Sequence, residues 1–422
     1  MADQPNAWGD FPRLHDKYPD LGTGPVPTEP YHSQAHFELE RDLIFRKSWL
    51  IVGRVEEIPN PGDYLAMDIE VARSAILIVR GRDGEVGAFY NQCSHRGSKV
   101  VRSGTGSCKL FQCPFHGWIY NLDGSLRGIP DEKGYFDLDK AGLSLTPLAA
   151  DVWSGFIFVN FDPQPAESLS EFLGAFGTDI GDYPFGAFAD NMAEWRVELN
   201  CNWKIFKDAF QEGFHLPFLH HRTLGGIYSN SSNPFNYVLD CKLYPRHHSM
   251  SQPGADRPIE PTGLMKIARD FGAPEAQHAA SLQANEDHAF SYTPGTNWTR
   301  NPRWDVDLHA IFPNITMNTF AAGRYLINII WPLSLDRTLW IARSYSPKPR
   351  TAGERFSFEF NKVFLRDILI EDGSTVEGTH AAIRSGAKQT MPLHEQEIMV
   401  RHDRKVIEDH VGFYRDREAP RG

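Results

Sequence analysis

The sequence is poor in cysteine and has no long apolar run. Its 422 residues include only 5 Cys, and so few scattered thiols do not form the disulfide framework of a small secreted domain. Nowhere do 18 consecutive apolar residues occur, as a transmembrane helix would need. The first 30 residues lack a basic start followed by an apolar run, so we expect no signal peptide and a cytoplasmic protein.

The chain also has fewer basic than acidic residues. The chain has 43 Lys and Arg against 54 Asp and Glu, a formal net charge of -11, which argues against nucleic acid and anionic membranes as partners. Histidine is plentiful by contrast, with 17 residues. Few cysteines and many unevenly placed histidines suggest that the chain binds metal.

The pattern of apolar residues predicts two different kinds of domain along the chain. A helix is expected over residues 33–50, capped by Ser33. From 51 to 160, short β-rich runs alternate with turn signals such as Asp83-Gly84, which predicts an all-β domain. Beyond 188 we expect an α+β domain with strands at 195–199, 310–316, 324–330 and 338–345, helices at 202–214 and 352–385, and an irregular segment at 230–301. The expected domains are therefore 1–46, 47–160 and 161–422.

Two tight loops in the β-rich part each pair a cysteine with a histidine. They are Cys93-Ser94-His95 and Cys113-Pro114-Phe115-His116. Tetrahedral zinc would accept this donor set, and so would a [2Fe-2S] cluster with two Cys on one iron and two His on the other. The single residue inside the first pair is unusual for zinc, and the glycines that follow allow close backbone approach to a cluster. The other cysteines, 108, 201 and 241, are expected to be buried thiols.

A second motif joins Glu212 to a group of histidines at the end of the 202–214 helix. Asp208, Glu212 and His215 are spaced to share one helix face, and His215 and His220 straddle the helix end. Two histidines and a carboxylate with open positions form the facial triad of non-haem Fe(II) oxygenases. Taken alone, histidines at a helix end explain the motif equally well as caps. His221 is expected behind the site or on the surface.

Together the motifs resemble the Rieske non-haem iron oxygenases, the aromatic-ring-hydroxylating family, in their alpha (catalytic) subunit. The resemblance rests on both Cys/His loops and on Asn202-Trp203-Lys204 with the E-x-x-H-x-x-x-x-H run, and it extends over residues 30–386. It implies an α+β chain, in which an all-β Rieske domain precedes a helix-grip (START-like) catalytic domain with an antiparallel sheet and a long C-terminal helix. It also implies the site residues: Cys93, His95, Cys113 and His116 for the cluster, and His215 and His220 for mononuclear Fe(II).

The same resemblance implies two roles for carboxylates. Glu212 takes the position that links a Rieske histidine of one subunit to the iron-binding histidine of the next, where many members have Asp. The third iron ligand comes from a late helix in the family. The run Ile370-Glu371-Asp372-Gly373 resembles that segment, and we expect Asp372, with Glu371 and Asp367 as alternatives or a solvated acidic face as the plain explanation.

The resemblance finally implies the function. We expect a terminal oxygenase component that takes electrons, ultimately from NAD(P)H, through a reductase and/or ferredoxin. Dioxygen-derived oxygen would be inserted into an aromatic or bulky hydrophobic substrate, by hydroxylation or cis-dihydroxylation. The alternatives are oxidative demethylation, quaternary-ammonium oxidation, or a non-enzymatic Rieske electron carrier. A homotrimer is expected, possibly with a separate beta subunit, and basic residues at 96, 99, 102 and 109 are expected to attract an acidic ferredoxin.

Overall fold

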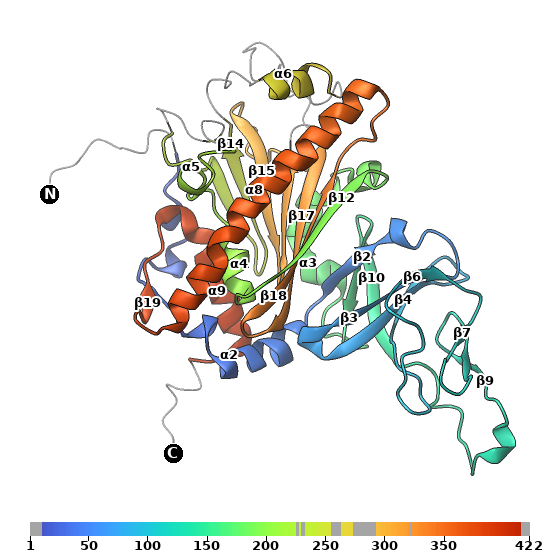
Figure 1. Ribbon diagram of the computed structural model, residues 1–422. Coiled ribbons are helices and arrows are strands. Elements are labelled where there is room, and N and C mark those ends of the chain that lie inside the picture. Colours follow the sequence, from blue (N-terminus) through green and yellow to red (C-terminus); the bar gives the residue numbers. More distant parts are fainter. Residues whose placement is uncertain are drawn as a thin grey trace, which may run out of the picture. The chain divides into compact units, whose positions relative to one another are not determined.

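The computed structural model describes residues 11–224, 228, 233–254, 263–272, 293–320 and 323–414 (Figure 1). The chain divides into two compact units. One comprises Glu38–Gly177, and the other comprises Thr178–Gly422 together with Met1–Phe37. Within the described ranges, no helix combines the length and the apolar character that crossing a bilayer requires.

The unit Glu38–Gly177 is built on antiparallel β-structure, as predicted. Its main sheet has the order β2-β11-β10-β5-β4-β3-β6. The strands are β2 (Leu50–Arg54), β3 (Asp63–Ile69), β4 (Ser74–Arg80), β5 (Val86–Tyr90), β6 (Gly104–Ser107), β10 (Pro147–Trp153) and β11 (Phe156–Asn160). A smaller sheet joins β7 (Phe111–Gln112), β8 (Ile119–Tyr120) and β9 (Leu126–Gly128). The second Cys/His loop connects β7 to β8, so a hairpin holds its two ends together.

The helix expected over residues 33–50 is shorter and less regular than predicted. It comprises α2 (Gln34–Leu39) and a π-helical stretch, η3 (Glu40–Phe45), before β2 begins at Leu50. Ser33 caps it as predicted, because its hydroxyl accepts a hydrogen bond from the His36 N–H at 3.3 Å. The region after β11 contains α3 (Leu169–Gly181).

The second unit is an antiparallel sheet crossed by one long helix, which confirms the α+β, helix-grip prediction (Figure 1). The sheet order is β12-β18-β17-β16-β15-β14-β13. Its strands are β12 (Met192–Leu199), β13 (Asp240–Leu243), β14 (His248–Pro253), β15 (Trp304–Ile311), β16 (Ile315–Phe320), β17 (Arg324–Ser334) and β18 (Arg337–Tyr345). The helices are α4 (Trp203–Ala209), α5 (Leu216–Leu219), α6 (Gly263–Asp270), α8 (Ala352–Arg384) and α9 (Ile398–Val411). Near the N-terminus, α1 (Leu14–Lys17) is followed by β1 (Val26–Pro27), which pairs with β19 (Thr390–Met391).

Two predictions for this unit were wrong in detail. The strand expected at 310–316 is interrupted: its ends belong to β15 and β16, and residues 312–314 form the hairpin turn between them, where Pro313 has no N–H to donate to a ladder. The segment expected to be irregular, 230–301, contains β13, β14 and α6, and the remainder lies partly outside the described residues. Strand β14 escaped prediction because it buries polar side chains such as His248, Ser249 and Ser251 instead of apolar ones.

Buried ion pairs fasten α4 to α9 and so fix the helix from which the second motif extends. The ammonium of Lys207 lies 2.6 Å from Asp403 Oδ1, and both side chains are almost fully buried. Asp208 accepts hydrogen bonds from Arg404 Nη2 at 2.7 Å and from the Tyr31 hydroxyl at 2.6 Å. Removing one partner of such a pair strongly destabilises the fold, because the other charge is left buried and unpaired. This end of α4 therefore has little freedom to move.

Candidate metal centres

The two Cys/His loops have the same backbone hydrogen-bond pattern. In the first, Gly97 N–H donates to the Cys93 carbonyl at 3.0 Å, and in the second Gly117 N–H donates to the Cys113 carbonyl at 3.0 Å. Both glycines are left-handed, with φ of 78° and 69°, a conformation that costs glycine no strain. Each loop is therefore a tight turn that closes on its own cysteine.

The four side chains provide a donor set that fits a [2Fe-2S] cluster. Cys93 and Cys113 are buried, and the half-buried rings of His95 and His116 have their centroids 4.6 Å apart. Their Nδ1 atoms are buried, and within the described residues neither has a hydrogen-bond partner. Buried nitrogens left unpaired are costly, whereas iron would use their lone pairs. The His95 ring is held in place by stacking on Trp118 at 5.1 Å.

The protein also supplies hydrogen bonds to the sulfur atoms. The Tyr120 hydroxyl lies 3.2 Å from Cys93 Sγ and accepts a hydrogen bond from the Ser94 N–H at 3.0 Å, so its own O–H is free to donate to the sulfur. Burial acts to raise the pKa of Cys113, but the N–H groups of Phe115 and His116 bond the thiolate and hold that pKa below its ordinary value. These hydrogen bonds favour anionic sulfur, whereas burial still holds the pKa of Cys93 above its ordinary value.

The second group brings together His215, His220 and Asp372. His215 and His220 flank α5, and Asp372 comes from α8. Their potential ligand atoms all lie within 4.8 Å of one another. Asp372 Oδ1 is 2.9 Å from His220 Nε2 and 3.7 Å from His215 Nε2. Two imidazoles and one carboxylate at this spacing suit a divalent iron with open positions.

Each histidine in this group turns its other ring nitrogen to a second carboxylate. Glu212 Oε1 is 2.5 Å from His215 Nδ1, and Glu212 Oε2 also accepts the His215 backbone N–H at 3.1 Å. Glu371 Oε2 is 2.8 Å from His220 Nδ1. Carboxylates behind ligating histidines fix the tautomer and the ring orientation. Both Nε2 atoms consequently face Asp372.

This geometry separates the three acids that the sequence left as alternatives. Asp372 faces both Nε2 atoms, whereas Glu371 faces the opposite side of the His220 ring. Asp367 is half-exposed and pairs with Arg366 at 2.7 Å. Asp372 as the third ligand remains a prediction, and its position agrees with that role.

The acids around the histidines control their protonation in the absence of metal. Burial alone would lower the pKa of His215, but the charge and hydrogen bond of Glu212, together with Asp372, raise it to about 9. Burial likewise opposes charge on His220, and its bonds to Asp372 and Glu371 still raise its pKa. A metal ion must therefore displace protons from these histidines, whose charged forms the acids stabilise, when it binds.

The route of the chain into this site differs from the sequence prediction. The helix expected to reach Phe214 ends at Ala209, and Glu212 lies in the turn that follows. The Gln252 and Asn236 amides pack so close to Gly213 that any side chain there would displace them. Asp208 consequently does not share a face with Glu212, and it pairs with Arg404 instead.

The remaining residues that the sequence singled out lie around the two groups. His221 is exposed, with Nδ1 3.1 Å from the Phe218 carbonyl. Phe210 packs on Trp340, and Phe214 stacks on His394 at 4.1 Å. In the basic loop, Lys99 pairs with Asp68 at 2.5 Å. Docking of an acidic ferredoxin on this loop remains a prediction, which the salt dependence of cluster reduction would test.

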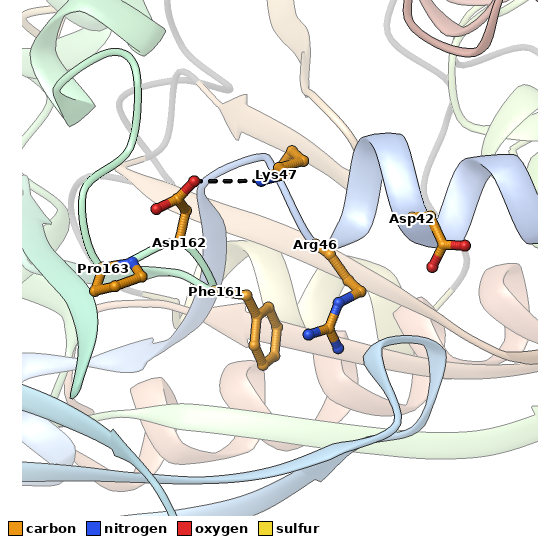
Figure 2. A pocket seen from close by; sticks show the side chains of 6 residues that line it. All are labelled: Asp42, Arg46, Lys47, Phe161, Asp162 and Pro163. Atoms are coloured by element: carbon orange, nitrogen blue, oxygen red, sulfur yellow. Dashed lines mark hydrogen bonds and ion pairs between the residues drawn. The ribbon is translucent and has the colours of Figure 1, made fainter. Parts of the chain in front are cut away.

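A separate shallow pocket occurs in the unit Glu38–Gly177 (Figure 2). Its volume is about 360 Å³, and its lining residues are Asp42, Arg46, Lys47, Phe161, Asp162 and Pro163. Lys47 pairs with Asp162 at 3.2 Å, and Arg46 lies over the Phe161 ring while donating to the Ala72 carbonyl at 2.6 Å. Its charged groups are thus already engaged, and none of the candidate ligands lines it.

Comparisons with known proteins match the two parts of the chain in which the two groups lie. A family model for the catalytic domain of ring-hydroxylating alpha subunits matches residues 189–412, and one for the Rieske [2Fe-2S] domain matches residues 48–143. The chain is 35% identical to the carnitine monooxygenase oxygenase subunit of Acinetobacter baumannii over 188 residues, 44% of this chain and 49% of that protein. It is 34% identical to the biphenyl dioxygenase alpha subunit of Metapseudomonas furukawaii over 215 residues, 47% of this chain and 44% of that protein.

The fold comparison covers nearly the whole chain. The structure of naphthalene 1,2-dioxygenase from Rhodococcus sp. has a TM-score of 0.70 at 20% identity, over 97% of both chains, which shows a shared fold. The chain spans about half the length of the curated relatives it matches. Because the catalytic-domain model covers more than half of its residues, the chain belongs to the Rieske non-haem iron oxygenase alpha subunits of the ring-hydroxylating family.

Proposed function

We propose that the protein is a terminal oxygenase component with a Rieske cluster and a mononuclear Fe(II) in one chain. The observation that supports this most strongly is the convergence of His215, His220 and Asp372 within 4.8 Å, in a chain that also carries a Rieske domain. An electron carrier alone would need no facial triad. The same observation therefore disfavours the non-enzymatic alternative.

The cluster would be held by Cys93, His95, Cys113 and His116, and the iron by His215, His220 and Asp372. When bound, the two centres supply electron transfer and dioxygen chemistry at the substrate. The chain itself positions the donors: Trp118 supports His95, and Glu212 holds His215 through Nδ1. Burial of His220 and Asp372 keeps bulk water from that side of the site.

We further propose that Glu212 carries the contact between subunits. One of its oxygens faces His215 Nδ1 at 2.5 Å, and a carboxylate can accept further bonds, including one from an imidazole of a neighbouring chain. That arrangement needs a head-to-tail interface, and the simplest closed form is a homotrimer. Electrons would come from NAD(P)H through a separate reductase or ferredoxin.

For the substrate we propose an aromatic or bulky hydrophobic molecule. The similarity to the biphenyl dioxygenase alpha subunit supports this choice. A quaternary-ammonium substrate is the second candidate. It is supported by the similarity to the carnitine monooxygenase oxygenase subunit.

The test is oxygen incorporation. The purified protein would be supplied with NADH, a generic ferredoxin and reductase, and ¹⁸O₂, and offered a panel of aromatic hydrocarbons and a panel of quaternary ammonium compounds. We expect label in a product from one panel. Transfer of electrons to dioxygen with no labelled product from either panel would contradict the proposal.

A further inference from the structure

Glu371, which precedes the expected iron ligand Asp372 on α8, contacts the opposite side of the His220 ring. Glu371 and Asp372 are consecutive, and each bonds one nitrogen of His220, at 2.8 Å to Nδ1 and at 2.9 Å to Nε2. We propose that Glu371, together with Thr223, is a positioning residue that sets the tautomer and orientation of His220 for metal binding. This inference rests on the proposed mononuclear iron site.

The first step in the argument is the tautomer. An ionised carboxylate can only accept hydrogen bonds. Once a metal ion takes Nε2, the His220 ring keeps a single proton, and Glu371 holds that proton on Nδ1. The nitrogen left for the metal is the one that already faces Asp372 Oδ1.

The second step is the shared oxygen. Glu371 Oε2 accepts the Thr223 hydroxyl at 2.5 Å as well as the His220 ring nitrogen. Thr223 lies three residues beyond His220, so the bond also fastens the segment that follows α5 to α8. Two donors on one oxygen fix the carboxylate in place, which a single flexible Glu contact would not do.

The third step is burial. The His220 side chain is 1% exposed and Glu371 is 19% exposed. Water is therefore poorly placed to replace the carboxylate if it is removed, and the Nδ1–H would lose its partner at full cost. His215 has an equivalent partner in Glu212, so each ligating imidazole has its own acid.

The experiment measures metal binding directly. The mononuclear metal is removed by anaerobic chelation with the cluster left in place, and the protein is titrated with Co(II). The oxidised cluster is diamagnetic, so the EPR signal of high-spin Co(II) reports the mononuclear site alone. We expect Glu371→Ala to bind Co(II) 10- to 100-fold more weakly, with an altered EPR spectrum.

Three further variants make the result specific. Glu371→Gln keeps an acceptor oxygen at the same reach, so most of the affinity should return, and Thr223→Val should lose part of it. Asp367→Ala removes an exposed acid one turn earlier on α8 and should bind as the unmodified chain does. Visible absorption of the cluster and circular dichroism check that each variant is folded.

The outcomes separate this inference from the proposed function. If Asp372→Ala loses Co(II) while Glu371→Ala binds it with unchanged affinity and spectrum, the positioning role of Glu371 is overturned and the iron site stands. If both variants bind Co(II) like the unmodified chain, the iron site itself is overturned, and the proposed function with it.

Discussion

Glu212 and Glu371 have the same contact with a histidine ring and different expected roles. Each bonds the Nδ1 of one candidate iron ligand. The Glu371 oxygen that bonds His220 also accepts a hydrogen bond from Thr223 within the chain. Glu212, by contrast, is expected to receive a histidine from a neighbouring subunit. Their variants should therefore fail in different ways.

Glu212→Ala should leave the cluster intact and weaken iron binding, and turnover should stay reduced roughly 100-fold or more even at saturating iron. The reason is that the electron route between subunits is lost along with the support of His215. Stopped-flow reoxidation of the pre-reduced cluster by dioxygen and substrate measures this directly. Glu371→Ala is the matched control, because its turnover should recover when iron is in excess. Normal coupled activity of Glu212→Ala would refute the bridging role.

The Tyr120 hydroxyl should raise the midpoint potential of the cluster. Its hydroxyl lies 3.2 Å from Cys93 Sγ, and a donor at sulfur stabilises the reduced, more negative cluster. A hydrogen bond worth about 1 kcal/mol corresponds to roughly 40 mV for a one-electron couple. We therefore expect Tyr120→Phe to lower the midpoint potential by about that amount in a redox titration. Tyr90→Phe is the control, because the Tyr90 ring packs on Phe161, and it should leave the potential unchanged. Equal potentials in the unmodified chain and both variants would show that Tyr120 does not affect the cluster potential.

At the scale of elements, the Cys/His loops were the part of the site most accessible from sequence. Each is contiguous, and its glycines occupy left-handed positions where the turn requires them. The choice of Asp372 over Glu371 rested on the family resemblance, because two adjacent acids on a helix differ only in direction. Spacing along the chain does not say which of them faces His220 Nε2.

Other elements escaped prediction for equally physical reasons. Helix α4 ends at Ala209, and beyond it Gly213 packs against the amides of Gln252 and Asn236, contacts that are invisible in the local pattern. Strand β14 and helix α9 bury polar and charged residues such as His248, Lys207's partner Asp403, and Arg401. A method that searches for apolar periodicity misses elements of this kind.

The buried histidines on β14, β15 and α9 predict acid sensitivity. Burial lowers the pKa of His309 to about 3 and that of His402 to about 4, and lowers that of His248 well below its ordinary value. In the unfolded chain they take up protons near pH 6.5. Below that pH the unfolded state binds more protons than the folded state, so stability falls as pH falls, by about 1.4 kcal/mol per histidine per pH unit.

The measurement is the free energy of unfolding in urea between pH 7.5 and 5. Gln at position 309 can still bond Ser249 and Thr319. His309→Gln should therefore reduce the slope of unfolding free energy against pH, below pH 6.5, by the contribution of one histidine, about 1.4 kcal/mol per pH unit. His410→Gln changes an exposed histidine on α9 and serves as the control. An unchanged slope in His309→Gln would show that His309 is already charged in the folded state.

At the scale of the whole molecule, each compact unit carries one complete donor set. The cluster donors all lie in Glu38–Gly177, and the mononuclear donors all lie in the other unit. Under the proposed function, the units would divide electron storage from substrate chemistry, and the proposed trimer would join the two functions between neighbouring chains. The family, the fold and both motifs were predictable from sequence, whereas the substrate is not, because it depends on the shape of a cavity and not on a motif.

The central claim is that one chain holds both a cluster and a mononuclear iron. Iron per chain after anaerobic purification and reconstitution tests it most directly. The account predicts about three irons for the unmodified chain and about two for Asp372→Ala, with the same cluster absorption in both. About two irons in each protein would contradict the account, since the facial triad would then bind no iron and the chain would be an electron carrier.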